Sequence, residues 1–139
     1  MMSLKDKCYL INFKEFGDSR GKLVAIEGNK TIPFDIKRIF YIYDSDSNVI
    51  RGQHANKESN FILISISGKC KVKVSDGREE IVISLNKPNT GLYIPKMVWK
   101  DMYDFSDNAV LLCLSDKEYL ASEYITDIND IIINSTRRG

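Results

Sequence analysis

Short segments in which apolar and polar residues alternate constrain the fold of this chain more than any other feature. From Lys69 to Val74 a lysine alternates with a cysteine or a valine, which places the apolar residues on one face and the lysines on the other. This pattern is typical of a β-strand with one buried and one solvated face. Asp76-Gly77 follows, before a second alternating segment from Ile81 to Leu85, and such a pair between two strands predicts a hairpin.

The same pattern recurs along the chain. Further strands are predicted at Cys8–Phe13, Leu23–Glu27, Ile36–Tyr43, Phe61–Ile66, Gly91–Ile94 and Ala109–Leu114. Many short strands with brief, turn-rich separators predict an all-β sandwich or barrel. Helical periodicity is limited to a short C-terminal helix over Lys117–Tyr124. We expect one domain over residues 1–139, with a core at about residues 10–125 and a tail at 126–139.

Composition excludes several classes of protein. Hydrophobic residues make up 43% and charged residues 28%, a balance typical of globular domains. The net charge of +1 favours neither nucleic acid nor an anionic membrane, so an anionic ligand needs a local basic cluster. The chain has no apolar run of the ~20 residues that span a bilayer and no signal-peptide pattern. The three cysteines, Cys8, Cys70 and Cys113, form no CxxC pair. We expect them to be buried free thiols in the cytoplasm.

The single histidine, His54, lies in the segment Arg51-Gly-Gln-His-Ala-Asn56. Imidazole titrates near neutral pH and can therefore both accept and donate a proton. Any histidine chemistry in this protein must use His54. The alternative is a partly buried structural histidine.

Several motifs that keep a fixed order suggest a family. They are Asp18–Gly21, Ile32–Arg38, Arg51–Ala55, Gly91–Ile94, Trp99–Met102 and Asp104–Ser106. In these motifs the chain resembles the WxcM-like cupins from about Leu10 to Ile125, and most of all the dTDP-4-keto-6-deoxyglucose 3,4-ketoisomerases of deoxysugar and polysaccharide biosynthesis. The resemblance implies a double-stranded β-helix, or jelly roll, in a cytoplasmic homodimer with exchanged N-terminal strands. From the residues alone, the first strand can pair with its own sheet or with a partner subunit.

Cupins in general often bind a metal through an HxH pair, a glutamate and a later histidine. Carried onto this chain, those positions fall at His54, Asn56, Asn60 and Lys100. Asparagine is a poor ligand for a transition metal, and an ammonium group repels a cation. We therefore expect no metal and no other cofactor.

The implied reaction moves a carbonyl from C4 to C3 of a nucleotide-linked sugar through an enediol. In the resembling family, the two histidines of the HxH pair and a strand tyrosine transfer the protons. Here His54 remains as the candidate base, whereas Asn56 replaces the second histidine and Phe40 the tyrosine. Asn56 can bind a sugar hydroxyl. Lys100 follows Trp99, where relatives carry His or Arg, and can stabilise an oxyanion or donate a proton if burial lowers its pKa.

Three arginines and three aromatic residues are candidate ligand contacts. A nucleoside diphosphate favours the forked donors of guanidinium, which makes candidates of Arg20, Arg38 and Arg51. The alternatives are a turn residue for Arg20, a solvated pair for Lys37-Arg38 and a surface charge for Arg51. Tyr41, Tyr43 and Trp99 are the aromatic candidates, and core packing is the alternative for Trp99.

These residues support three functional hypotheses. The first is a metal-free isomerase acting on a thymidine-diphosphate-linked 4-keto-6-deoxyhexose, with His54 as the base. The second is a cupin that binds a nucleotide sugar but has lost turnover, because three positions around the reaction centre differ. The third is an isomerase or epimerase acting on a related sugar.

Overall fold

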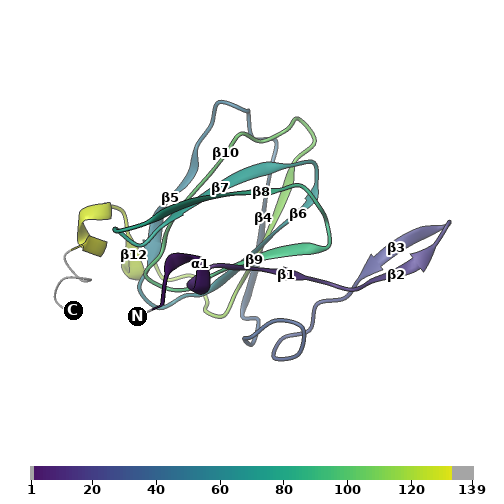
Figure 1. The fold of residues 1–139 in the computed structure, drawn as a ribbon, viewed down its shortest axis with the longest axis horizontal. Coiled ribbons are helices and arrows are strands. Elements are labelled where there is room, and N and C mark those ends of the chain that lie inside the picture. The colour runs from purple at the N-terminus through teal and green to yellow at the C-terminus, as the bar shows by residue number, and fades with distance from the viewer. Residues whose placement is uncertain (1, 133–139) are drawn as a thin grey trace.

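The computed structural model describes residues 2–132, which form two facing five-stranded antiparallel sheets (Figure 1). The first sheet has the order β1 (Tyr9–Asn12), β9 (Thr90–Ile94), β6 (Phe61–Ser67), β11 (Val110–Ser115), β4 (Arg38–Tyr43). The second has the order β12 (Tyr124–Ile125), β5 (Arg51–Asn56), β10 (Trp99–Tyr103), β7 (Cys70–Ser75), β8 (Glu80–Leu85). Most sheet neighbours are distant in sequence, as in a jelly roll.

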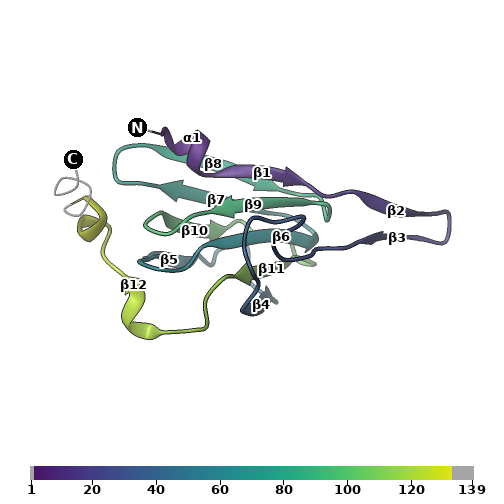
Figure 2. The same ribbon diagram turned by 90° about the horizontal axis from the view of Figure 1, so that it is seen from below.

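Smaller elements flank the two sheets. A short helix α1 (Leu4–Lys7) precedes β1 and is capped by the Ser3 side chain. Strands β2 (Glu15–Asp18) and β3 (Gly21–Val24) form a separate hairpin that projects from the body, on the side opposite the last helical turn (Figure 2). A 3-10 turn η1 (Ala121–Glu123) leads into β12. Within residues 2–132, no helix is long and apolar enough to cross a membrane.

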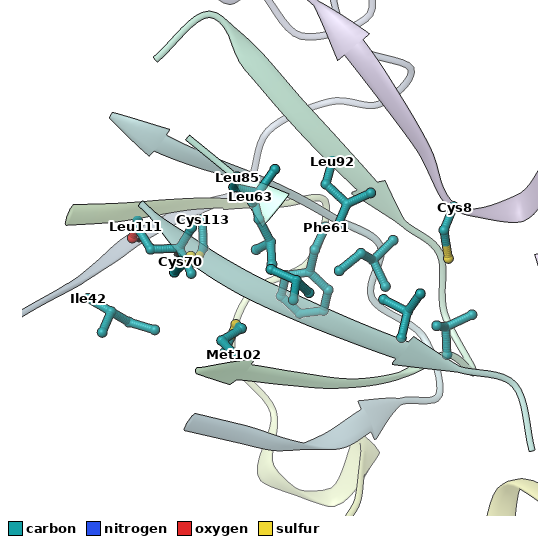
Figure 3. Close-up of a cluster of buried hydrophobic side chains, with 14 of the residues drawn as sticks. Cys8, Ile42, Phe61, Leu63, Cys70, Leu85, Leu92, Met102, Leu111 and Cys113 are labelled. Carbon is teal, nitrogen blue, oxygen red and sulfur yellow. Dashed lines mark hydrogen bonds between the residues drawn. The ribbon is translucent and has the colours of Figure 1, made fainter. Parts of the chain in front are cut away.

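The core fills the space between the sheets (Figure 3). Strand β7 contributes Cys70, Val72 and Val74, all buried, while its lysines face outward. This confirms the face that the alternation assigns to each residue. Strand β8 pairs with β7 from Glu80 to Leu85, which confirms the predicted hairpin. Phe61 and Leu63 on β6 pack against this layer from the opposite sheet.

Some boundaries differ from those predicted. The strand expected over Leu23–Glu27 is β3 and ends at Val24. The helix expected over Lys117–Tyr124 is wrong in extent, because only Ala121–Glu123 is helical there, as one 3-10 turn. A helical turn begins instead at Ile128, and the chain beyond residue 132 lies outside the described residues. Strands β5 and β10 were not predicted at all, and both carry candidate site residues.

Candidate active site

His54 and Lys100 lie opposite each other on the neighbouring antiparallel strands β5 and β10. Side chains directly opposite across two strands project from the same face of the sheet. For this pair the face is the interior of the fold: Lys100 is only 3% exposed and His54 is half-buried. Trp99 and Asp101 flank Lys100 on β10 and project to the other side, since successive side chains alternate.

A β-bulge just before His54 sets the position of its ring. The pairing of β5 with β10 skips Gln53, so that His54 faces Lys100 while Gly52 faces Asp101. Gly52 and Gln53 both have left-handed backbone angles, with φ of 83° and 56°. A Cβ atom at Gly52 would lie 2.8 Å from the carbonyl oxygen of Lys100. Only glycine fits there without strain.

The bulge also determines which ring nitrogen of His54 is the base. His54 Nδ1 lies 2.9 Å from the carbonyl oxygen of Gly52. A carbonyl oxygen only accepts hydrogen bonds, so Nδ1 carries the hydrogen and Nε2 keeps its lone pair. Burial, followed by the nearby charge of Lys100, lowers the pKa of His54 to about 4. The imidazole is therefore neutral at pH 7 and can accept a proton at Nε2.

Lys100 is a buried ammonium with two close contacts. Its Nζ donates to Oδ1 of Asn56 at 3.3 Å and lies 4.1 Å from the centre of the Phe61 ring. Burial lowers the pKa of Lys100 from 10.5 to about 8. Lys100 is mostly protonated at pH 7, yet it gives up a proton more readily than an exposed lysine.

Asn56 and a buried carboxylate, Glu123, both lie near this lysine. Asn56 is 1% exposed, and its Nδ2 makes no hydrogen bond of ordinary geometry to the described part of the chain. Glu123 accepts hydrogen bonds from the Ser59 hydroxyl and from the backbone amides of Glu58 and Ser59. Burial raises the pKa of Glu123, but these hydrogen bonds, with a contribution from Asn56, hold it below its ordinary value. Glu123 is therefore an anion that partly balances Lys100.

Arg38 adds a second cation and is surrounded by aromatic rings. Its guanidinium carbon lies 4.9 Å from the centre of the Phe40 ring, 5.9 Å from Phe61 and 5.6 Å from Tyr119. These distances are typical of cation–π contacts. Nη2 of Arg38 donates to the hydroxyl of Tyr124 at 3.2 Å.

A cavity of about 560 Å³ opens beside His54. Its walls include Tyr41 and Arg51, with Val49, Ile50 and Met102 as apolar lining. This volume lies within the ~300–1,000 Å³ of small-molecule sites. Arg51 is exposed at this cavity, so a guanidinium is available to a ligand that reaches His54; Tyr41, which also lines the cavity, is exposed as well.

The structure brings together most of the residues expected from the sequence. His54, Asn56, Lys100 and Arg38 surround Phe61 and Tyr124, and Arg51 and Tyr41 line the cavity. Glu123 and Tyr124 were missed, because the sequence places them in a segment expected to be helical. No signal in the sequence marks them, because they reach the site only through the pairing of β12 with β5, which places Tyr124 opposite Asn56.

Three other candidate ligand contacts lie away from His54 in this chain. Arg20 lies at the turn of the projecting hairpin and forms an ion pair with Asp18, with Nη2 to Oδ2 at 2.7 Å. Trp99 packs with Ala55 and other apolar residues on the opposite face of β5 and β10. Its Nε1 donates to Asp101 at 3.2 Å. Tyr43 lines a separate pocket of about 270 Å³.

The chain is similar to several known proteins. The family model described as FdtA, WxcM-like, C-terminal, matches residues 6–135. A curated TDP-4-oxo-6-deoxy-alpha-D-glucose-3,4-oxoisomerase from Aneurinibacillus thermoaerophilus is 45% identical over 116 residues, which is 84% of each chain. A crystal structure of a 3,4-ketoisomerase from Helicobacter canadensis is 43% identical with a TM-score of 0.90, over 93% of this chain and 97% of that one.

A further solved structure is a histidine-to-asparagine mutant of a 3,4-ketoisomerase from Thermoanaerobacterium thermosaccharolyticum. It was crystallised in complex with TDP-4-keto-6-deoxyglucose. It is 38% identical to this chain, with a TM-score of 0.93, over 97% of this chain and 98% of that one.

Proposed function

Because the chain belongs to the WxcM-like family, we propose that it is a nucleotide-sugar 3,4-ketoisomerase. Its substrate is a 4-keto-6-deoxyhexose linked to thymidine diphosphate, and it acts in deoxysugar biosynthesis. The observation that carries the proposal is a neutral imidazole beside a buried ammonium, at a cavity of sugar size. These two groups are a base and an electrophile, the pair that enolisation of a ketone needs.

Each step of the isomerisation uses groups that this chain supplies. Nε2 of His54 removes the hydrogen from C3, which the neighbouring C4 carbonyl makes acidic. The C3–H electron pair forms a C3=C4 double bond and negative charge gathers on O4, where the ammonium of Lys100 stabilises it. C4 then takes a proton from the imidazolium of His54 as C3 becomes the ketone. The 3-hydroxyl loses its proton and O4 gains one, so the product is the 3-keto, 4-hydroxy sugar.

Binding uses the cationic and aromatic groups around His54. Arg51 is positioned to hold the diphosphate with its forked donors, and Tyr41 offers a ring surface to the base. Asn56 binds a sugar hydroxyl and positions Lys100. One related ketoisomerase holds the keto sugar although one of its histidines is an asparagine. That complex shows that a related ketoisomerase can hold the keto sugar after one of its histidines has been replaced.

We also propose a cytoplasmic homodimer. Cys8, Cys70 and Cys113 are free and buried, as in proteins of reducing compartments. In the single chain β1 pairs with β9, and the β2–β3 hairpin projects with Phe16 and Leu23 exposed. Exchange of N-terminal strands between two subunits would cover this hairpin and bring Arg20 to the partner.

Isotope exchange tests the enzyme directly. The purified protein is incubated with TDP-4-keto-6-deoxyglucose in deuterated water, and deuterium at C3 is followed by NMR. We expect exchange and a 3-keto product from the wild type and neither from His54→Asn. Calorimetry with TDP measures binding separately. If the wild type binds TDP but shows no exchange, the proposed isomerase activity is wrong and the protein is a nucleotide-sugar-binding cupin. A product of different stereochemistry would instead indicate an epimerase that acts on a related sugar.

A further inference from the structure

Tyr124 belongs to the same site as His54, although 70 positions separate the two residues along the chain. Strand β12 pairs with β5 so that Tyr124 lies opposite Asn56. The ring of Tyr124 contacts His54, with 4.7 Å between ring centres. The same ring lies 5.6 Å from that of Tyr119. Tyr124 is therefore fixed by backbone pairing and by two ring contacts.

The hydroxyl of Tyr124 is prepared for proton transfer by Arg38. Nη2 of Arg38 donates to this hydroxyl at 3.2 Å, so the phenol oxygen acts as acceptor and its own hydrogen is available to another group. The guanidinium stays charged and is held by the rings of Phe40, Phe61 and Tyr119. A phenolate formed at Tyr124 would be stabilised by this permanent positive charge.

The reaction needs a group of this kind, because the proton of the 3-hydroxyl must be removed while O4 gains one. His54 already transfers the carbon-bound hydrogen from C3 to C4, so another group must transfer the proton between the two oxygens. The Asn56 amide does not transfer protons at neutral pH, and Phe40 has no hydroxyl. Lys100 is directed toward Asn56 and Phe61, where it stabilises charge.

We propose that Tyr124 is a catalytic residue that carries the proton between the two sugar oxygens. This inference rests on the proposed isomerase function. As His54 takes the C3 hydrogen, the phenol gives its proton to O4 and becomes a phenolate beside Arg38. The phenolate then takes the proton of the 3-hydroxyl, the O3–H electron pair forms the C3 carbonyl, and the C3=C4 pair takes a proton from His54 at C4. Both side chains return to their starting protonation states.

The decisive experiment compares Tyr124→Phe with the wild type in deuterated water. The variant keeps the ring that contacts His54 and loses only the hydroxyl. We expect TDP affinity within about threefold of the wild type, and formation of the 3-keto product reduced about 100-fold or more. Deuterium exchange at C3 should fall much less, because Lys100 still stabilises the enolate. The control is Tyr119→Phe, which removes a hydroxyl but keeps the ring on Arg38, and should retain product formation.

Three results would overturn the proposal. The first is that Tyr124→Phe forms the 3-keto product at a rate within about threefold of the wild type. The second is that deuterium exchange at C3 and product formation fall by the same factor in Tyr124→Phe. The third is that Tyr119→Phe loses as much product formation as Tyr124→Phe does. If Tyr124→Phe does not fold, 3-fluorotyrosine at position 124 keeps size and hydroxyl but is a stronger acid. The pH dependence of product formation should then move to lower pH, and an unchanged profile would overturn the proposal. Absence of exchange by the wild type would instead contradict the isomerase function.

Discussion

Replacing Lys100 by methionine should stabilise the protein at neutral pH while removing its activity. Lys100 is 3% exposed, and burial lowers its pKa from 10.5 to about 8. Keeping it protonated in the folded state costs about 3 kcal/mol, at 1.36 kcal/mol for each pKa unit. Methionine fills a similar volume against Phe61 and carries no charge. Its cost is an unpaired Oδ1 on Asn56, of about 1–2 kcal/mol.

The net expectation at pH 6.5 is a variant that is about 1–2 kcal/mol more stable than the wild type. The dependence on pH gives a sharper test. Between pH 8 and pH 10.5 the unfolded chain keeps the Lys100 proton that the folded chain has released, so the stability of the wild type rises with pH in that window. Lys100→Met has no such dependence. The free energy of unfolding of the wild type should therefore rise by about 2 kcal/mol relative to that of Lys100→Met from pH 6.5 to pH 9.5, which closes or reverses the gap.

Urea denaturation at the two pH values, followed by tryptophan fluorescence of Trp99, measures this gap. Lys71→Met is the matched control, because Lys71 is exposed on β7 and forms an ion pair with Asp104 at 3.4 Å. Its difference from the wild type should change little with pH. The reasoning would be refuted if Lys100→Met were less stable than the wild type at pH 6.5 and if the difference in their free energies of unfolding did not vary with pH. That result would show that keeping Lys100 protonated in the folded state costs no stability. The 3-keto product should be lost from Lys100→Met in either case.

Three further predictions follow from the same geometry. Because the pKa of His54 is about 4, C3 exchange should stay constant down to about pH 5 and fall below it, and a fall centred near pH 6.5 would contradict a buried base. Gly52→Ala should lower the free energy of unfolding by about 1–3 kcal/mol and slow C3 exchange, because φ is 83° at this position and the new Cβ would meet the Lys100 carbonyl oxygen. A thermal midpoint equal to that of the wild type would show that the position carries no backbone strain. If the wild type binds TDP but turns over poorly, Asn56→His with Phe40→Tyr should raise product formation at least tenfold, and no gain would exclude these two positions as the cause.

Alternation along the sequence was sufficient to predict the half-buried strands. Strand β7 alternates lysine with apolar residues, and its buried face is the one predicted. Strand β5 was missed because it carries Arg, Gln, His and Asn and contains a bulge that breaks the period of two. Strand β10 was missed because its inward residue at position 100 is a lysine. Strands β5 and β10 both depart from the apolar–polar alternation where they carry residues of the candidate site, as expected when functional residues conflict with the local sequence preferences of a strand.

The residues of the site divide in the same way. His54 is identifiable from sequence because it is the single imidazole, and Lys100 because it follows Trp99 in a family motif. Glu123 and Tyr124 have no comparable signal, since only the pairing of β12 with β5 brings them beside Asn56. Arg20 and Trp99 have the side chains that ligand contacts need, but a projecting hairpin and an outward-facing position keep both away from His54.

The charge balance around Phe61 explains why such a site favours one kind of ligand. Lys100 and Arg38 contact this ring as cations, His54 is neutral, and Glu123 is the buried anion beside them. The cluster therefore carries an excess positive charge in a desolvated interior. Burial lowers the pKa of both His54 and Lys100, the charge of Lys100 adds to the effect on His54, and the charge of Arg38 adds to the effect on both. An enediolate brings the missing negative charge, whereas a neutral ground-state sugar does not. The interaction is stronger with the intermediate than with the substrate, and this difference is what accelerates a reaction.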